Sequence, residues 1–156
     1  MTPGGATHPM GERERLALFN IIAECLPGAS VLDLYAGSGA LGIEAVSRGA
    51  LEVVFVEKNR EACDAIKRNL EELGVHGKVV KRGVAEFIQE TEGTWDAVLA
   101  DPPYDRFDSL EIAEISKVLG KILVLSHPGE APTIPGLNLV KSRSYAKAMI
   151  SVYEKA

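Results

Sequence analysis

The chain alternates between short apolar runs and amphipathic stretches in which apolar residues recur at helical spacing. The short runs fit buried strands, and they span residues 30–35, 51–57, 78–82, 95–101 and 121–126. The helical patterns span residues 11–26, 39–49, 59–74, 84–90 and 109–119. Asn59 is placed to cap the third of these helices and Gly74 to end it. Because apolar strands alternate with helices, the sequence predicts an α/β fold with a mostly parallel sheet and helices on both faces.

The C-terminal part departs from this alternation. Segment 127–136 contains three prolines and two glycines, which is typical of a loop. Residues 137–142 and 146–155 then have the pattern of a closing hairpin. We therefore expect a seven-stranded sheet in a single domain over residues 1–156, with strands one to five parallel and the last one antiparallel. Residues 1–10 are expected to form a loosely ordered N-terminal arm.

Composition excludes several classes of protein. The net charge of -5 does not favour a nucleic-acid binder, so any basic surface must be local. The two cysteines form no CxxC motif and the three histidines are scattered, so no metal site is expected. The N-terminal residues do not resemble a signal peptide, and no apolar run approaches the roughly 18 residues that span a bilayer. We expect a cytoplasmic protein without membrane contact.

Three polar signals follow the ends of predicted strands. They are residues 33–39, Glu57 and residues 101–104. In parallel sheets ligands bind beyond the carboxyl ends of the strands, near the point where the strand order reverses. We therefore expect the three signals to share one crevice.

The first signal contains a glycine loop. Gly37, Gly39 and Gly42 match GxGxxG, the dinucleotide fingerprint, and Glu57 lies 18 residues after Gly39, about where that fingerprint places an acid for a ribose. An NAD-dependent enzyme is therefore a serious alternative. The glycines would allow the backbone to approach a ligand closely.

Asp33 favours a different ligand. It lies four residues before Gly37, where a carboxylate would repel a pyrophosphate and attract an ammonium group. S-adenosylmethionine carries an ammonium, a sulfonium and a ribose, and it has no phosphate. Glu57 could accept hydrogen bonds from both ribose hydroxyls. The loop thus favours S-adenosylmethionine over a dinucleotide.

The motif DPPY at residues 101–104 suits the exocyclic amine of a nucleobase. The lone pair of such an amine is delocalised into the ring, and hydrogen-bond acceptors can localise it. Asp101 supplies a carboxylate acceptor and Pro102 a carbonyl, while the two prolines stiffen the turn. Tyr104 offers a flat face on which a base can stack. The acceptors would stabilise the positive charge that builds on nitrogen during methyl transfer, and a paired base would have to be flipped out.

Three stretches, VLDLYAGSGALGIEAVSRGA, VFVEKN and ADPPY, resemble the RsmD-like class I methyltransferases, and the likeness runs from about Thr7 to the C-terminus. This resemblance implies a Rossmann-like class I methyltransferase fold. It implies transfer of a methyl group from S-adenosylmethionine to the N2 amine of a guanine in 16S ribosomal RNA, with S-adenosylhomocysteine as product. The expected partner is ribosomal RNA within a small-subunit particle, and the enzyme is expected to act as a monomer.

The resemblance also assigns roles to individual residues. Glu57 would hold the ribose and Lys58 would flank the adenine. The methionine end of the cofactor would be lined by Asp33, Tyr35, Ala36, Gly37, Ser38 and Gly39. The target amine would be held by the catalytic residues Asp101, Pro102, Pro103 and Tyr104.

The sequence departs from the family pattern at four places. The basic hairpin with which members usually begin is absent. His8 and Met10 replace the arginine and threonine that flank the proline of the entry segment. Gly83 replaces an acid or amide that binds the adenine amine, so backbone contacts from Val84 and Ala85 would have to suffice. The fifth strand ends in Ser126-His127 where members have a Glu-His-like pair.

Two other functions stay open at this point. An adenine-amine methyltransferase acting on DNA or RNA would share the motifs, although no segment is long enough for a target-recognition insertion. A cofactor-binding subunit without catalysis is the other, and the missing hairpin motivates it. Among further residues, His127 and Trp95 favour structural roles, and Lys141, Arg143 and Lys147 form a basic turn that either faces solvent or contacts RNA phosphates.

Overall fold

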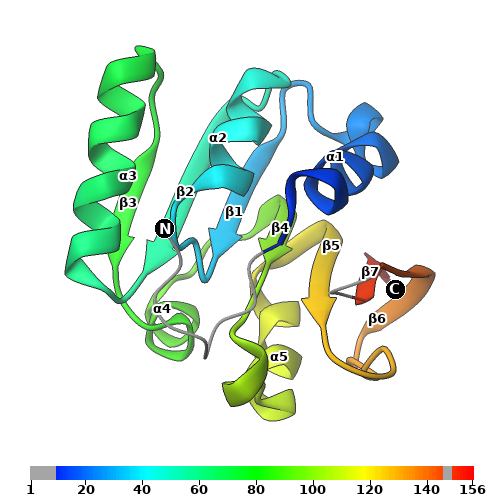
Figure 1. The fold of residues 1–156 in the computed structure, drawn as a ribbon. Coiled ribbons are helices and arrows are strands. Elements are labelled where there is room, and N and C mark those ends of the chain that lie inside the picture. The colour runs from blue at the N-terminus through cyan, green and yellow to red at the C-terminus, as the bar shows by residue number, and fades with distance from the viewer. Residues whose placement is uncertain (1–9, 146–148) are drawn as a thin grey trace.

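A computed structural model describes residues 10–145 and 149–156, and within them one sheet runs in the order β3-β2-β1-β4-β5-β7-β6 (Figure 1). The strands are β1 (Ser30–Leu34), β2 (Glu52–Glu57), β3 (Lys78–Lys81), β4 (Trp95–Ala100), β5 (Leu119–His127), β6 (Leu137–Ser144) and β7 (Met149–Lys155). Strands β1 to β5 are parallel, and β7 pairs antiparallel with both β5 and β6. The predicted seven-stranded sheet with an antiparallel last strand is confirmed.

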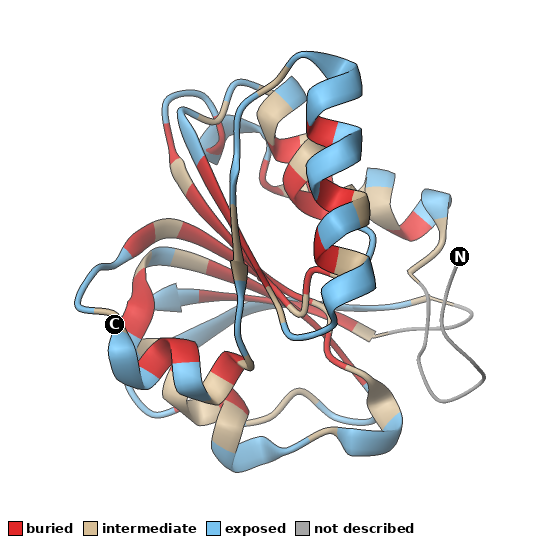
Figure 2. Cartoon of the chain, turned by 90° about the vertical axis from the view of Figure 1, so that its left-hand side faces the viewer, coloured by how far each residue is buried: buried red, intermediate tan, exposed pale blue. Residues whose placement is uncertain are grey.

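Helices cover both faces of the sheet (Figure 1). The α-helices are α1 (Glu12–Ile21), α2 (Ala40–Ser47), α3 (Arg60–Leu73), α4 (Val84–Glu90) and α5 (Ser109–Glu114). Short 3-10 turns lie at Ala23–Cys25, Tyr104–Arg106 and Ile115–Val118. Since neighbouring strand residues point to opposite faces, Val31 packs with α1, α2 and α3, whereas Leu32 packs with α4 and α5. Figure 2 shows the buried positions along the strands between these helical layers.

Two predicted helices end earlier than their apolar patterns suggest. Helix α1 stops at Ile21 and tightens into a 3-10 turn, because the chain must reverse to enter β1, and Gly28 is held there by its hydrogen bond to the carbonyl of Gly49 at 2.8 Å. Helix α5 stops at Glu114, and Leu119 belongs to β5, where it pairs with Trp95. Apolar spacing alone could not separate these short turns from the helices before them.

The predicted cap and end of α3 are confirmed, and Gly42 has a packing role in α2. The side chain of Asn59 accepts a hydrogen bond from Ala62, and Gly74 ends α3 in the left-handed conformation. Gly42 lies in the first turn of α2 against β2, where a Cβ atom would come within 2.3 Å of the Phe55 ring. The third glycine of GxGxxG therefore serves helix-strand packing, which does not by itself identify the ligand.

No helix in the described part of the chain is long and apolar enough to cross a membrane.

Candidate functional site

The polar strand ends lie along one edge of the sheet. Leu34 of β1 pairs with Val56 and with Ala100. The residues that follow these three are Tyr35, Glu57 and Asp101. The strand order reverses between β1 and β4, which is where parallel sheets form their ligand crevice.

The glycine loop is fixed from β2. Glu57 Oε1 accepts a hydrogen bond from the backbone N–H of Gly37 at 2.8 Å, and Oε2 accepts one from Asn59 at 2.9 Å. The N–H of Ala36 bonds to the carbonyl of Val56 at 3.0 Å. Gly37 and Gly39 have φ angles of 56° and 81°, which favour glycine. A carboxylate has about four acceptor positions, so Glu57 retains capacity for further donors.

Asp33 lies beneath this loop. It is only 1% exposed, and its Oδ2 accepts a hydrogen bond from the N–H of Gly42 at 3.0 Å. Burial raises the pKa of Asp33 well above its usual value, and the negative charges of Asp101 and Glu57 raise it further. The three carboxyl groups are therefore close enough to interact electrostatically, and their sharing of one ligand crevice stays a prediction.

Asp101 has an unsatisfied acceptor. Its Oδ1 atom is buried and has no hydrogen-bond partner in the described structure. Burial raises the pKa of Asp101 to about 6, and a hydrogen bond with Ser126 opposes that rise. A buried carboxylate oxygen left without a donor is rare and costly, and such groups are characteristic of binding sites. The atom suits a donor supplied by a ligand.

The rest of DPPY shapes the turn after β4. Pro102 is buried and Pro103 is half-buried, and the chain then makes a 3-10 turn that begins at Tyr104. The hydroxyl groups of Tyr104 and Ser126 hydrogen-bond, which ties the tyrosine to the end of β5. Burial raises the pKa of Tyr104 to about 12, so the phenol stays neutral at physiological pH.

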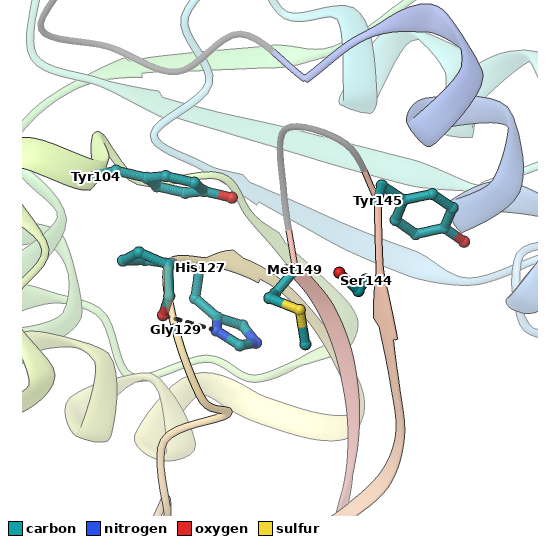
Figure 3. A pocket seen from close by; sticks show the side chains of 7 residues that line it. Tyr104, His127, Gly129, Ser144, Tyr145 and Met149 are labelled. Carbon is teal, nitrogen blue, oxygen red and sulfur yellow. Dashed lines mark hydrogen bonds between the residues drawn. The ribbon is translucent and has the colours of Figure 1, made fainter.

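A cavity of about 290 Å³ opens beside Tyr104. Tyr104 and Tyr145 lie on opposite sides of it, with His127 and Met149 between them (Figure 3). Its volume is near the lower end of the range for small-molecule pockets. The cavity thus joins the DPPY turn to the hairpin of β6 and β7.

Three other predicted cofactor residues differ in burial: Tyr35 is half-buried, whereas Ser38 and Lys58 are exposed. Tyr35 adopts a left-handed φ of 57°, and its hydroxyl donates to Glu111 of α5, so its side chain packs beneath the sheet edge. Burial and the Glu111 carboxylate raise the pKa of Tyr35.

The residues at the start of α4 have small or buried side chains. Val84 is buried in the core, and Ala85 is half-buried beside it. Gly83 precedes the helix without a side chain to cap it. The side chain of Val84 is engaged in the core, and contacts from the backbone of Val84 and Ala85 to a ligand stay a prediction.

His127 and Trp95, for which structural roles are predicted, are packed in the core. His127 is fully buried, its Nε2 atom lies 2.7 Å from the Ser151 hydroxyl, and burial lowers its pKa. Trp95 is buried and contacts the ring of Phe87 at 5.6 Å between centroids. In the basic turn, Lys141 and Arg143 are exposed on β6, whereas Lys147 lies outside the described residues, as does His8.

The sequence patterns assign no site role to Ser126, Tyr145 or Met149. Ser126 departs from the family pattern, and it hydrogen-bonds Tyr104 although it does not itself line the cavity. Tyr145 and Met149 come from the closing hairpin, and no pattern in the chain places that hairpin beside β4. The one available signal was the polar Ser126 at the end of an apolar strand.

The sequence profile of the family described as Conserved hypothetical protein 95 matches residues 1–154. The chain belongs to this family, that of the RsmD-like class I methyltransferases. The Bacillus subtilis protein named "Putative rRNA methyltransferase YlbH" is 28% identical over 97% of this chain and 90% of its own length.

A curated relative supports the motif region, and a solved structure of a putative methyltransferase supports the fold. The Ribosomal RNA small subunit methyltransferase D of Escherichia coli is 35% identical over 63% of this chain. That match spans half of the relative's own length. A solved structure of yhhF from Escherichia coli has a TM-score of 0.87 and 26% identity, and the match covers 99% of this chain and 91% of that one. The predicted Rossmann-like class I methyltransferase fold is confirmed.

Proposed function

We propose that the protein transfers a methyl group from S-adenosylmethionine to the exocyclic N2 amine of a guanine in small-subunit ribosomal RNA, acting as a monomer and leaving S-adenosylhomocysteine. The observation that carries this proposal is the buried, unpartnered Oδ1 atom of Asp101 at the edge of the crevice. The names of the relatives, which are rRNA methyltransferases, support RNA as the substrate class.

The charge of the crevice favours S-adenosylmethionine over NAD. Asp33, Glu57 and Asp101 interact electrostatically there, and the pKa of Asp33 is raised in part by the other two. A pyrophosphate would add like charge to this cluster, whereas an ammonium and a sulfonium would offset it. Binding of a cationic ligand would lower the free energy of ionising Asp33.

The negative charge of the crevice suits the methionine end of the cofactor, and each predicted cofactor residue then has a role. The methionine end would lie against the loop made by Asp33, Tyr35, Ala36, Gly37, Ser38 and Gly39, with Tyr35 contributing its backbone because its side chain bonds Glu111. Glu57 would accept from the ribose with the lone pairs that Gly37 and Asn59 leave open. Lys58 would flank the adenine, and the backbone at Val84 and Ala85 would contact its edge.

The target base would occupy the cavity beside Tyr104. Tyr104, which lines this cavity, would stack on the ring. The amine would donate to Asp101 Oδ1 and to the carbonyl of Pro102, which lie next to the cavity lining in the chain, while Pro103 holds the turn. Bound S-adenosylmethionine would supply the methyl group, and its sulfur would keep the electron pair of the broken carbon-sulfur bond as the amine nitrogen bonds the methyl carbon. Asp101 would stabilise the positive charge that forms on nitrogen, and the proton of the resulting ammonium would pass to the Asp101 carboxylate and then to water.

A methyl-transfer assay tests this function. Radiolabelled S-adenosylmethionine would be supplied with small subunits, naked small-subunit RNA or DNA, and the products digested to nucleosides. We expect label in guanine of RNA. Label in adenine would assign the protein to the adenine-amine class, and S-adenosylhomocysteine binding without transfer to any substrate would assign it a non-catalytic role.

A further inference from the structure

A second cavity lies beside the first one. It has a volume of about 320 Å³ and is lined by Arg13 and Glu14 of α1 and by Ser144 and Tyr145 of the hairpin. Ser144 and Tyr145 also line the cavity next to Tyr104, so the two cavities share a wall. None of the roles proposed above uses this second cavity.

Glu14 is an unusual residue for such a position. It is only 8% exposed, yet its carboxylate makes no hydrogen bond or ion pair with any residue that the structure describes. Its oxygens are not among the buried side-chain atoms that lack a partner, so they keep contact with solvent at the cavity. The side chain folds back toward Gly11, where a Cβ atom would lie 3.0 Å from Oε2, and it lines the cavity. The carboxylate therefore lies beside Gly11 at the cavity, with its acceptor capacity left for a donor that enters the cavity.

The lining has the three components that a nucleotide requires. Tyr145 provides an aromatic face for stacking a base. Arg13 is exposed at the rim and provides a cation for a phosphate. Glu14 provides two acceptor oxygens, which match the paired N1–H and N2–H donors on the Watson–Crick edge of guanine. Adenine and cytosine offer only one amine on that edge, and uracil offers one N–H.

We propose that this cavity is a second nucleotide subsite, which binds a guanine next to the target base through Glu14, Tyr145 and Arg13. This inference rests on the proposed function, because it takes the substrate to be RNA. Single-stranded RNA is commonly recognised by stacking unpaired bases on aromatic side chains and hydrogen-bonding their edges. The shared wall of Ser144 and Tyr145 places the subsite where a neighbouring nucleotide of the same strand would lie.

Equilibrium binding of short RNAs tests the subsite without requiring turnover. The probes are fluorescein-labelled hexaribonucleotides UUGGUU, UUIGUU and UUGIUU, titrated by anisotropy at saturating S-adenosylhomocysteine. Inosine lacks the N2 amine, so each replacement removes one donor from one of the two guanines. Both single replacements are needed because the direction of the RNA strand across the two cavities is not fixed, so either guanine could occupy the second subsite.

The matched variants are Glu14→Gln and Glu12→Gln. Both remove one negative charge from the first turn of α1, but Glu12 is exposed and lies outside the cavity lining. For E14Q we expect the Kd for UUGGUU to rise about 10-fold, as for loss of a two-point base contact. One of the two inosine replacements should weaken binding to the wild type and to E12Q while leaving binding to E14Q nearly unchanged. Arg13→Ala should reduce the salt dependence of binding, as for loss of a phosphate contact.

The proposal would be overturned if the wild type bound none of these RNAs. It would also be overturned if E14Q bound all three with the affinities of E12Q. Should E14Q unfold, R13A carries the test alone, and an unchanged salt dependence and Kd contradict the subsite. RNA binding with these preferences but without methyl transfer would support the subsite while refuting the proposed function.

Discussion

Glu57 Oε1 accepts the backbone N–H of Gly37 at 2.8 Å, so the acid that ends β2 fixes the glycine loop that follows β1. Its second oxygen accepts the N–H of Asn59 at 2.9 Å, just before α3 begins. One side chain therefore joins two strand-helix connections at the crevice. Its remaining lone pairs are those that we propose accept from the ribose.

Replacement of Glu57 by alanine should weaken cofactor binding. Both backbone donors lose their acceptor and the ribose contacts are lost, so we expect the Kd for S-adenosylhomocysteine to rise about 10-fold or more, as for two lost charge-assisted hydrogen bonds. Isothermal titration calorimetry measures this. Glu61→Ala, at an exposed position in the first turn of α3, is the control. Unchanged affinity in the Glu57 variant would remove the ribose assignment.

Catalysis should depend on pH through Asp101. Burial raises its pKa to about 6, and only the ionised form carries the negative charge that offsets the positive charge forming on the amine nitrogen. We expect kcat/KM to rise with pH through about 6 and to level off above it. In Ser126→Ala the hydrogen bond that opposes the raised pKa is lost, so the rise should move to higher pH. A profile with no inflection near 6 would contradict this account of Asp101.

The same carboxyl group should destabilise the folded protein at neutral pH. Its pKa is raised above the unfolded value, so the folded state binds the proton more tightly and stability falls as pH rises from about 4 to about 6. We expect Asp101→Asn to unfold at a higher urea concentration than the wild type at pH 7.5. Its free energy of unfolding should be larger by about 2–3 kcal/mol at most. The difference should shrink as pH falls toward 4. Equal stability at pH 7.5 would show that the carboxylate is well solvated.

Alanine at Gly42 should disturb the packing of α2 on β2. The added Cβ would meet the Phe55 ring at 2.3 Å, so we expect a loss of about 1–3 kcal/mol from overpacking. Combining it with Phe55→Leu should recover part of this loss relative to the sum of the single changes. Chemical denaturation of the four proteins gives the coupling free energy. Strict additivity would mean that the ring does not contact the helix in solution.

The sequence predicted the sheet because its signals are local. Apolar runs between polar stretches located β1 to β5, and Asn59 and Gly74 marked the ends of α3. The edge at which Glu57 and Asp101 meet follows from parallel pairing alone. These features need no knowledge of side-chain contacts between distant segments.

The rest of the site depends on contacts that no local pattern encodes. The hydroxyl of Tyr35, a residue of the predicted cofactor loop, donates to Glu111, which is 76 residues away in the chain. Tyr145 reaches the cavity because β7 inserts between β5 and β6, which carries the hairpin back toward Tyr104. The burial of Glu14 is equally long-range, since the hairpin forms part of the cavity around it.

The central claim is that Asp101 holds the target amine while the glycine loop holds the cofactor. Its most direct test is Asp101→Ala, measured for methyl transfer to the RNA that the wild type modifies and for binding of S-adenosylhomocysteine. We expect turnover to fall by about 100-fold or more, the scale of a lost transition-state acceptor, while the Kd of the cofactor product changes little. Full turnover in this variant would contradict the claim.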